Sequence, residues 1–422
     1  MGHMMDLGAY INELGTKARK AAIEMARVDS ATKRDALMRI AEAVEKHSGQ
    51  ILESNAHDLA AGRAASLNEA MLDRLTLTEK RITAMARAIA EIADQPDPVG
   101  EVEHSVIRPS GIRVGKMRVP IGVIGIIYEA RPNVTTDAAA LCLKAGNACV
   151  LRGGKEALHS NVALASVVSE TAAAAGLPPD AVQLVGVTDR QTVALMAQAE
   201  GLIDVIIPRG GEALIRSVVA AAKVPVIKHY KGVCHTYVDA DADLDMARKI
   251  CFNAKVQRPG VCNAMETLLV HEKIAGAFLP PLFAQYREAG VSLRGCSKTI
   301  EIDSNVLRAT EEDWYAEYLD LILAVRVVSS LDEAIEHIRM YGSAHTDAIV
   351  TRNIQAAERF VREVDSSSVM VNVSTRFSDG GEYGLGAEIG ISTDKLHARG
   401  PMGAADLTTT KWVVTGDGVI RQ

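Results

Sequence analysis

One of the six cysteines in this sequence stands in a turn that could expose a nucleophile. The segment Gln257-Arg258-Pro259-Gly260-Val261-Cys262 sets Cys262 shortly after a Pro-Gly pair and just before an apolar run. Backbone N–H groups around a thiol in such a turn lower its pKa and can stabilise an oxyanion that forms beside it. A single cysteine in a turn is nevertheless more often inert than catalytic, so both interpretations stay open on these residues alone.

The other cysteines lack such a setting. Cys142, Cys149 and Cys251 fall within predicted helix or strand cores, where a thiol behaves as a small apolar side chain. No Cys-x-x-Cys pair and no local His or Cys spacing typical of zinc ligands occurs, so the sequence predicts no metal site. Scattered thiols in a cytoplasmic protein are expected to stay reduced, so the sequence predicts no disulfide framework.

Two glycine pairs follow apolar runs and could hold a phosphate. Arg152-Gly153-Gly154-Lys155 ends one such run, and Arg209-Gly210-Gly211-Glu212 lies between another run and a helical pattern. Paired glycines let a backbone approach a pyrophosphate, and the first turn of a helix supplies N–H donors. Neither a Gly-x-Gly-x-x-Gly nor a Walker A pattern is present. A tight turn with surface cations therefore explains these residues equally well.

The elements that must position these residues alternate between strand and helix from residue 120 to 230. The apolar runs are Ile121–Tyr128, Ala148–Leu151, Val182–Val185, Ile203–Ile207 and Val224–Ile227, and helical patterns include Asn161–Ala175 and Glu212–Ala222. Repeated strand–helix units predict an α/β fold with a parallel, doubly wound sheet of Rossmann type. A second mixed region follows to about residue 398, with strands predicted at Thr267–Val270, Leu323–Val328 and Val369–Val373.

Residues 6 to 95 are almost continuously helical in pattern. One predicted helix places four apolar side chains on a single face, namely Leu37, Ile40, Ala41 and Val44. The spacing of Thr76 and Glu79 is that of a capping box and predicts the start of a further helix that runs toward Ile92. These helices are expected to cover a face of the sheet.

Two strand-like segments lie outside the alternating regions. The stretch Val106–Val119 predicts a hairpin on the outside of the molecule, and Leu407–Val414 predicts a further strand near the other end of the chain. The two segments could pair with each other or with another subunit.

Length and composition limit the possible classes of protein. A chain of 422 residues is longer than one hydrophobic core usually organises, so at least two domains are expected. A net charge of -7 argues against nucleic acid as a partner, and no apolar run approaches the roughly 20 residues that cross a membrane. The residues before Met5 resemble an expression scar, no signal peptide follows, and a cytoplasmic protein is expected.

Four segments closely resemble one family of enzymes. They are Gln257–Cys262, Tyr341–Asp347, Asn372–Phe377 and Gly390–Gly403. They resemble the γ-glutamyl phosphate reductases of the aldehyde dehydrogenase superfamily, and the resemblance extends from about Asp6 to the last residue. It implies a nucleotide-binding domain at residues 1–103 and 121–231, a catalytic domain at 232–398, and a small β oligomerisation flap at 104–120 and 399–422.

The resemblance also implies a reaction. Cys262 would attack the acyl phosphate of L-glutamate 5-phosphate and expel phosphate, and NADPH would reduce the resulting thioester to L-glutamate 5-semialdehyde, a step of proline biosynthesis. Asn133 follows the proline of the family's oxyanion loop and would donate to the oxyanion beside the Cys262 N–H, or else it would cap a helix. His229 replaces the glutamate that activates water in hydrolytic relatives, and a structural role is favoured for it over proton transfer.

The same resemblance assigns residues to the cofactor. Arg152 matches a lysine that contacts the adenosine ribose, and Gly210 and Gly211 would form the pyrophosphate turn. Lys155 stands where relatives often have a glutamate, and a cation there favours NADP over NAD. Glu317 aligns with the glutamate that holds the nicotinamide ribose, although a surface carboxylate explains it equally well.

A phosphate substrate implies cations in its pocket. Arg131, Arg258 and Arg376 fall in the turns of family motifs, Arg376 is the strongest candidate for an anion contact, and His345 belongs to another motif. A homodimer or homotetramer is expected, with glutamate kinase as a possible partner for substrate transfer.

Three alternatives remain. A coenzyme A-acylating aldehyde dehydrogenase would keep the fold and change the acyl donor. A phosphotransferase could hold ATP at Arg152–Lys155, although no pair of aspartates for magnesium stands beside that loop. A non-catalytic scaffold would not depend on Cys262 at all.

Overall fold

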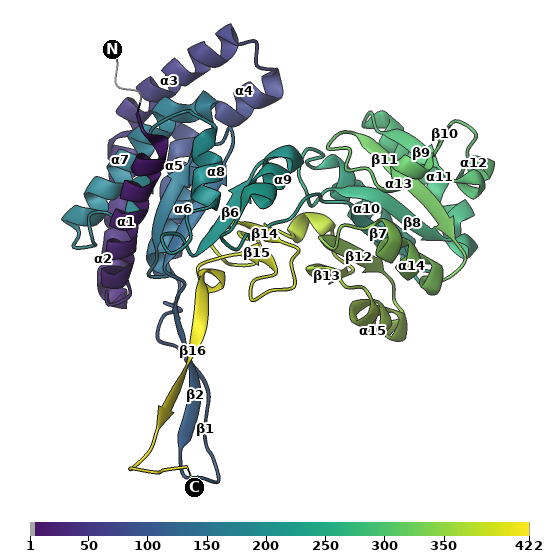
Figure 1. The fold of residues 1–422 in the computed structure, drawn as a ribbon. Helices are drawn as coiled ribbons and strands as arrows, with labels where there is room; N and C mark the ends of the chain where they lie inside the picture. Colours follow the sequence, from purple (N-terminus) through teal and green to yellow (C-terminus); the bar gives the residue numbers. More distant parts are fainter. Residues whose placement is uncertain (1–4, 422) are drawn as a thin grey trace. The chain divides into compact units, whose positions relative to one another are not determined.

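Two units of α/β architecture make up residues 5–421, the part of the chain that the computed structural model describes (Figure 1). The first unit comprises the chain up to Lys228 together with Gly384–Ile391 and the stretch from Leu396 onward. The second comprises His229–Tyr383 and Ser392–Lys395. The predicted catalytic domain ran on to residue 398 and so included segments that pack with the first unit here. The suggested expression scar at residues 1–4 lies outside the described residues.

Five helices open the first unit, as the helical pattern of residues 6 to 95 predicts. They are α1 (Leu7–Met25), α2 (Ser30–Lys46), α3 (Ser48–Ala64), α4 (Glu69–Leu75) and α5 (Glu79–Asp94). The predicted apolar face of α2 is buried throughout. The predicted capping residue of α5 is wrong by two positions, because the hydroxyl of Thr78 accepts from the N–H of Arg81 at 3.2 Å, whereas Thr76 ends α4.

A parallel four-stranded sheet forms the core of this unit. Its strands are β3 (Val123–Tyr128), β4 (Ala148–Arg152), β5 (Val182–Leu184) and β6 (Val205–Arg209), in the order β5-β4-β3-β6. The helices between and after them are α6 (Asn133–Lys144), α7 (Leu158–Ala174), α8 (Gln191–Ala197) and α9 (Glu212–Ala221). β4 and β5 lie on one side of β3 in the sheet, and the chain then crosses over to place β6 on the other side of β3. The carboxyl ends of β3 and β6 therefore flank the crevice where doubly wound sheets bind nucleotides.

The predicted strand at Val224–Ile227 is wrong. This segment makes a single bridge, between Ile206 and Val226. Its ladder is limited to the Ile206 N–H donating to the Pro225 carbonyl at 2.8 Å and the Ile227 N–H donating to the Ile206 carbonyl at 3.0 Å. Proline lacks an N–H, so this run cannot continue the hydrogen-bonding pattern in the other direction.

The outlying strands form a three-stranded antiparallel sheet, which we call the flap. It contains β1 (Val102–Ile107), β2 (Arg113–Pro120) and β16 (Thr408–Thr415), in the order β1-β2-β16. Of the two pairings that the sequence allowed, the strands pair with each other, with Trp412 opposite Lys116. The ammonium of Lys116 lies 4.9 Å from the centroid of the Trp412 ring. Figure 1 shows the flap extending from the body of the first unit. Two short strands that precede β16, β14 (Gly390–Ser392) and β15 (Gly400–Met402), pair with each other in a separate two-stranded sheet.

The second unit is built on a parallel seven-stranded sheet in the order β10-β9-β11-β8-β7-β12-β13. Its strands are β7 (Cys234–Val238), β8 (Met265–His271), β9 (Ser292–Gly295), β10 (Leu307–Arg308), β11 (Ile322–Val328), β12 (Thr346–Val350) and β13 (Ser368–Val371). Its helices are α10 (Leu244–Val256), α11 (Glu272–Glu288), α12 (Ser297–Ile302), α13 (Glu311–Trp314), α14 (Leu331–Tyr341) and α15 (Ile354–Glu363). The predicted α/β fold and the three strands predicted here are confirmed. No helix within residues 5–421 is both long and apolar enough to cross a bilayer.

Candidate active site

Cys262 lies in a tight turn between α10 and β8. The turn is closed by the N–H of Ala264, which donates to the carbonyl of Val261 at 3.0 Å. The Cys262 side chain is partly exposed, whereas Cys142, Cys149, Cys234 and Cys251 are buried. The predicted difference between this thiol and the thiols of the helix and strand cores is therefore present in the structure. Cys296 is also partly exposed, but its sulfur accepts from the N–H of Val327 at 3.4 Å.

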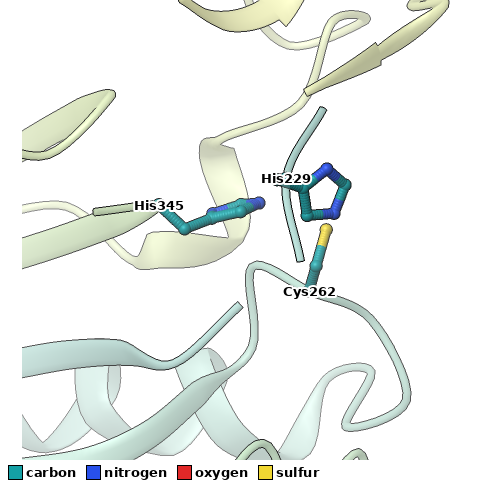
Figure 2. A group of neighbouring side chains, drawn as sticks. All are labelled: His229, Cys262 and His345. Atoms are coloured by element: carbon teal, nitrogen blue, oxygen red, sulfur yellow. The ribbon is translucent and has the colours of Figure 1, made fainter. Parts of the chain in front are cut away.

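Two imidazole rings stand beside the Cys262 thiol. One nitrogen of His229, one of His345 and the Cys262 sulfur all lie within 4.8 Å of one another. Figure 2 shows the sulfur directly beside the His229 ring, with the His345 ring pointing toward the same place. His345 is buried just before β12, and His229 is partly exposed ahead of β7. A thiol this close to an imidazole can transfer its proton to that ring and become a nucleophile.

The His229 ring is partly exposed and meets the His345 ring edge-on at a centroid distance of 5.5 Å. The structural role that the sequence favours for His229 stays a prediction. The contact joins segments more than a hundred residues apart. Local sequence patterns carry no signal for such a contact.

Cys234 contacts both the backbone of Cys262 and the ring of His345. Its sulfur donates to the carbonyl oxygen of Cys262 at 3.1 Å and lies 3.7 Å from Nδ1 of His345. Burial raises the pKa of the Cys234 thiol well above its usual value, so this group keeps its proton and remains a donor. The Thr346 hydroxyl lies 2.9 Å from the same Nδ1. Because the Cys234 proton points to the Cys262 carbonyl, the sulfur lone pairs and the Thr346 oxygen can both accept at Nδ1, which favours the tautomer of His345 with its proton there and its lone pair on Nε2.

Gly232 holds the Cys262 turn against β7. A side chain at position 232 would place its Cβ 1.9 Å from the carbonyl oxygen of Cys262, so only glycine fits. The Gly232 N–H donates to Oε1 of Glu317 at 2.8 Å. Glu317, predicted to hold a ribose, is thus tied to the backbone beside the thiol and is not an isolated surface carboxylate.

Arg376 donates hydrogen bonds to two side chains that flank Cys262 in the sequence. Its Nε donates to the side-chain oxygen of Gln257 at 2.8 Å, and its Nη1 donates to the amide oxygen of Asn263. Burial, together with the nearby charge of Arg258, lowers the pKa of Arg376. The structure therefore brings Arg376, Arg258 and Cys262 together. The sequence interpretation missed Gln257 and Asn263, the residues that orient this arginine.

A fully buried ion pair flanks the turn. Nζ of Lys255 lies 2.6 Å from Oε2 of Glu266, and neither side chain is exposed. Burial lowers the pKa of Lys255 and raises that of Glu266 to about 7. The other carboxylate oxygen accepts from the N–H of Leu319 at 3.2 Å. The pair ties the segments on either side of Cys262 to the loop that carries Glu317, and the sequence interpretation did not single it out.

In the first unit, the predicted pyrophosphate turn lies at the carboxyl end of β6, next to that of β3. Gly210 and Gly211 follow β6, and Glu129 follows β3. The N–H of Gly211 donates to Oε2 of Glu129 at 2.9 Å, while a Cβ at Gly210 would lie 2.4 Å from the same oxygen. The start of α9 therefore already binds a carboxylate, which shows that its N–H groups suit an anion.

The two cations beside the other glycine pair differ in their environments. Arg152 is buried, and its guanidinium donates to the carbonyls of Gly153 at 3.0 Å and Thr188 at 3.2 Å. Burial lowers its pKa. Lys155 is exposed at the start of a short 3-10 helix, Lys155–Ala157. Lys155 is therefore a surface cation, whereas Arg152 is not. The guanidinium of Arg152 instead holds the loop after β5 through its hydrogen bond to Thr188.

Arg131 lies in the turn after β3, two residues before Asn133. Asn133 is the first residue of α6, and Pro132 occupies the capping position. The helix-cap alternative for Asn133 is therefore wrong, because its side-chain amide donates instead to Oδ2 of Asp137 one turn further on, at 2.8 Å. Its predicted catalytic role stays a prediction.

The carboxyl edge of the seven-stranded sheet carries none of the predicted site residues. A hollow of about 470 Å³ lies there, lined by residues that follow β12 and β13, among them Arg352, Asn353 and Asn372. Cys262, Cys234 and His345 lie instead at the amino ends of β8, β7 and β12. The second unit therefore differs from the first, in which the candidate residues follow the usual rule for such sheets.

Comparisons with known proteins show the family to which the chain belongs. Residues 8–295 match the aldehyde dehydrogenase family. The γ-glutamyl phosphate reductase of Geobacter metallireducens is 56% identical over 418 residues, which cover 99% of this chain and 100% of that protein. The crystal structure of γ-glutamyl phosphate reductase from Thermotoga maritima is 47% identical, covers 98% of this chain and 100% of that one, and has a TM-score of 0.95.

More distant proteins share only the fold. An acetylating aldehyde dehydrogenase from Geobacillus thermoglucosidasius is 17% identical, with a TM-score of 0.69 over 99% of this chain and 98% of that one. This likeness concerns the architecture of the two units and not their substrates. The chain therefore belongs to the aldehyde dehydrogenase family of oxidoreductases and, within it, to the γ-glutamyl phosphate reductases.

Proposed function

We propose that this chain uses NADPH to reduce L-glutamate 5-phosphate to L-glutamate 5-semialdehyde, with release of phosphate, in proline biosynthesis. The observation that carries the proposal is the partly exposed Cys262 thiol with two imidazole rings within 4.8 Å. The names of the relatives supply the substrate.

The first chemical step is acyl transfer to the thiol. An imidazole beside Cys262 takes the thiol proton, and Nε2 of His345 is the favoured acceptor. The thiolate then attacks the acyl carbon, the carbon–oxygen bond to phosphate breaks, and phosphate leaves with the bonding electrons. The product is a thioester on Cys262. The Cys262 N–H is the proposed donor to the oxyanion, with Asn133 as the predicted second donor.

The substrate anion needs cations next to the nucleophile. Arg376 and Arg258 supply them on the Cys262 turn, and Arg131 is predicted to contribute from the turn after β3. Arg376 is oriented by Gln257 and Asn263, which fixes the direction of its fork. A fixed guanidinium is well suited to a phosphate because it binds two oxygens at once.

The proposed cofactor binds the first unit at the carboxyl ends of β3 and β6, where the strand order reverses. Gly210 and Gly211 would approach its pyrophosphate, and exposed Lys155 would lie near a 2′-phosphate, which is the basis for proposing NADPH. Arg152 would shape this site through the loop it fastens, and Glu317 stays the predicted contact to the nicotinamide ribose. When bound, NADPH supplies the hydride that reduces the thioester. His229 stands in place of a water-activating carboxylate, so this site favours reduction of the thioester over its hydrolysis.

The proposal is tested by running the reaction in reverse. The protein is mixed with glutamate semialdehyde and NADP, and NADPH formation is followed with and without phosphate. We expect formation to require phosphate, to disappear in Cys262→Ser, and to persist in Cys296→Ser. NADPH formation that is equally fast without phosphate would overturn the proposal, and formation that requires coenzyme A instead would identify an acyl-coenzyme A reductase.

Assembly through the flap is a second part of the proposal. Exposed apolar side chains gather on it, with Ile107 and Trp412 each 65% exposed. We propose that a second copy of the chain covers them, in a homodimer or homotetramer. Transfer of the acyl phosphate from glutamate kinase stays a prediction.

A further inference from the structure

The three side chains at the candidate site are also a ligand set for a soft divalent cation. A cysteine thiolate and two imidazole nitrogens are typical zinc ligands. In a tetrahedral zinc site, bonds of about 2.0–2.3 Å separate the ligand atoms by roughly 3.3–3.8 Å. The Cys262, His229 and His345 atoms already lie within 4.8 Å of one another, so a movement of about 1 Å closes the set.

We propose that Zn²⁺ binds Cys262, His229 and His345 and thereby reversibly inhibits the enzyme. The metal would take the lone pair of the thiolate and leave no nucleophile for the acyl carbon. The inhibition, though not the metal binding itself, rests on the proposed role of Cys262. Three protein ligands leave one tetrahedral position open for water, so the metal would remain accessible to a chelator.

The surroundings of His345 prepare it for metal binding. A histidine ligand normally uses its second ring nitrogen to donate to a nearby oxygen or other acceptor, and this contact fixes the tautomer and the orientation of the ring. Nδ1 of His345 lies 2.9 Å from the Thr346 hydroxyl and 3.7 Å from the Cys234 sulfur. Both contacts engage Nδ1, which assigns the role of metal ligand to Nε2.

The ligands come from three separate segments, which explains why the sequence predicts no metal site. Zinc motifs are recognised when two ligands lie a few residues apart. Here the nearest two in sequence, His229 and Cys262, are separated by thirty-two intervening residues. Only the parallel sheet, which places the segments before β7, β8 and β12 next to each other, assembles the set.

The test uses cobalt as a spectroscopic probe of the full-length protein. Chelator-treated enzyme is titrated with Co²⁺, and the near-ultraviolet sulfur-to-cobalt band and the visible bands of tetrahedral cobalt are recorded. We expect one equivalent to bind, the sulfur band to be absent in Cys262→Ser, and the band to remain in Cys296→Ser. Loss of one ligand in His229→Ala should weaken cobalt binding by at least about tenfold. Zn²⁺ should displace the cobalt.

Activity provides the second readout. Micromolar Zn²⁺ should inhibit the phosphate-dependent reaction and protect Cys262 from iodoacetamide, and EDTA should reverse both effects. No sulfur-to-cobalt band in the parent, or the same band in Cys262→Ser, would overturn the metal site whatever the enzyme reduces. A normal cobalt spectrum in a protein without reductase activity would instead defeat the proposed function and leave the metal site standing.

Discussion

A thiol attacks a carbonyl only after it has lost its proton, so Cys262 depends on the side chains immediately around it. His345 and His229 are the adjacent acceptors, and Cys234 fixes the backbone carbonyl beneath the thiol. The chemistry of this site is therefore shared between four residues from three segments. Substitution of any one of them should alter the rate of thiol alkylation as well as the rate of turnover.

Glu129 is a residue whose removal should improve cofactor binding. Its carboxylate occupies the Gly211 N–H at the start of α9, where the pyrophosphate is proposed to bind, and two anions compete for the same donor. In Glu129→Ala, the Kd for NADPH should fall by about fivefold, which corresponds to roughly 1 kcal/mol. Fluorescence titration of NADPH measures the change.

The isosteric variant Glu129→Gln separates charge from shape. Its amide oxygen can still accept from Gly211, so it should bind NADPH with an affinity between those of the parent and the alanine variant. A Kd that rises in both variants would mean that Glu129 maintains the glycine turn instead of competing with the cofactor.

The loop between α9 and β7 follows a backbone path that only a glycine at position 232 allows. In Gly232→Ala, the new Cβ would meet the Cys262 carbonyl oxygen at 1.9 Å, so the turn must shift. Misplacement of a nucleophile by about 1 Å costs roughly a hundredfold in rate. We expect kcat to fall by at least about that factor, as measured in the phosphate-dependent assay.

Gly276 provides the matched control. It lies within α11 with nothing within 4 Å of an added Cβ, so Gly276→Ala should leave turnover unchanged and stabilise the helix by about 0.5–1 kcal/mol. Equal kcat values in the two alanine variants would contradict the importance of the Gly232 contact.

Helix α14 carries a histidine that should make the second unit sensitive to acid. Burial, followed by the charges of His235 and Arg326, lowers the pKa of His337 from 6.5 to about 2. Below pH 6.5 the unfolded chain takes up this proton and the folded chain does not, so stability falls as the pH is lowered. The loss should reach about 2 kcal/mol at pH 5.

Urea unfolding at pH 5 and pH 7.5 measures this effect. In His337→Gln the side chain can still accept from Arg326, which donates to the ring at 3.2 Å in the parent, but it does not titrate. The part of the pH dependence that is due to His337 should disappear. His57→Gln, at an exposed position, is the control and should leave the pH dependence as it is in the parent.

The elements themselves were largely predictable because their signals are local. Runs such as Thr267–Val270 and Leu323–Val328 became buried strands, since continuous apolar residues suit a sheet covered on both faces. Val224–Ile227 is also apolar, but Pro225 has no N–H to donate, and the segment makes only a single bridge. The Cys262 turn was also visible locally. The contact between His229 and His345 was not, because it depends on β7 and β12 becoming neighbours. The Lys255–Glu266 pair depends on how α10 packs against β8.

At the scale of the whole molecule, the flap predicts how copies of the chain associate. Trp412 and Val414 lie on the same face of β16 and are 65% and 54% exposed. Two charges at these positions should prevent a second copy from covering the sheet. We expect Trp412→Glu with Val414→Glu to reduce the mass measured by light scattering from that of an oligomer to that of a monomer.

A substitution on the opposite face controls for the added charge. Lys411 alternates with Trp412 along β16 and is exposed, so Lys411→Glu should leave the assembly intact. A parent protein that is already monomeric at assay concentrations would contradict the role of the flap.

The pairing of β2 with β16 also determines when the first unit can finish folding during translation. Thr408 lies opposite Pro120, and Asn147 donates through its side chain to the Leu407 carbonyl at 2.8 Å. The whole second unit is synthesised between these partners and can reach its native state while the ribosome is still working. The first unit must wait for β16, its final strand, so a stalled nascent chain would carry Cys262, His229 and His345 in a folded second unit while β2 still lacked its partner.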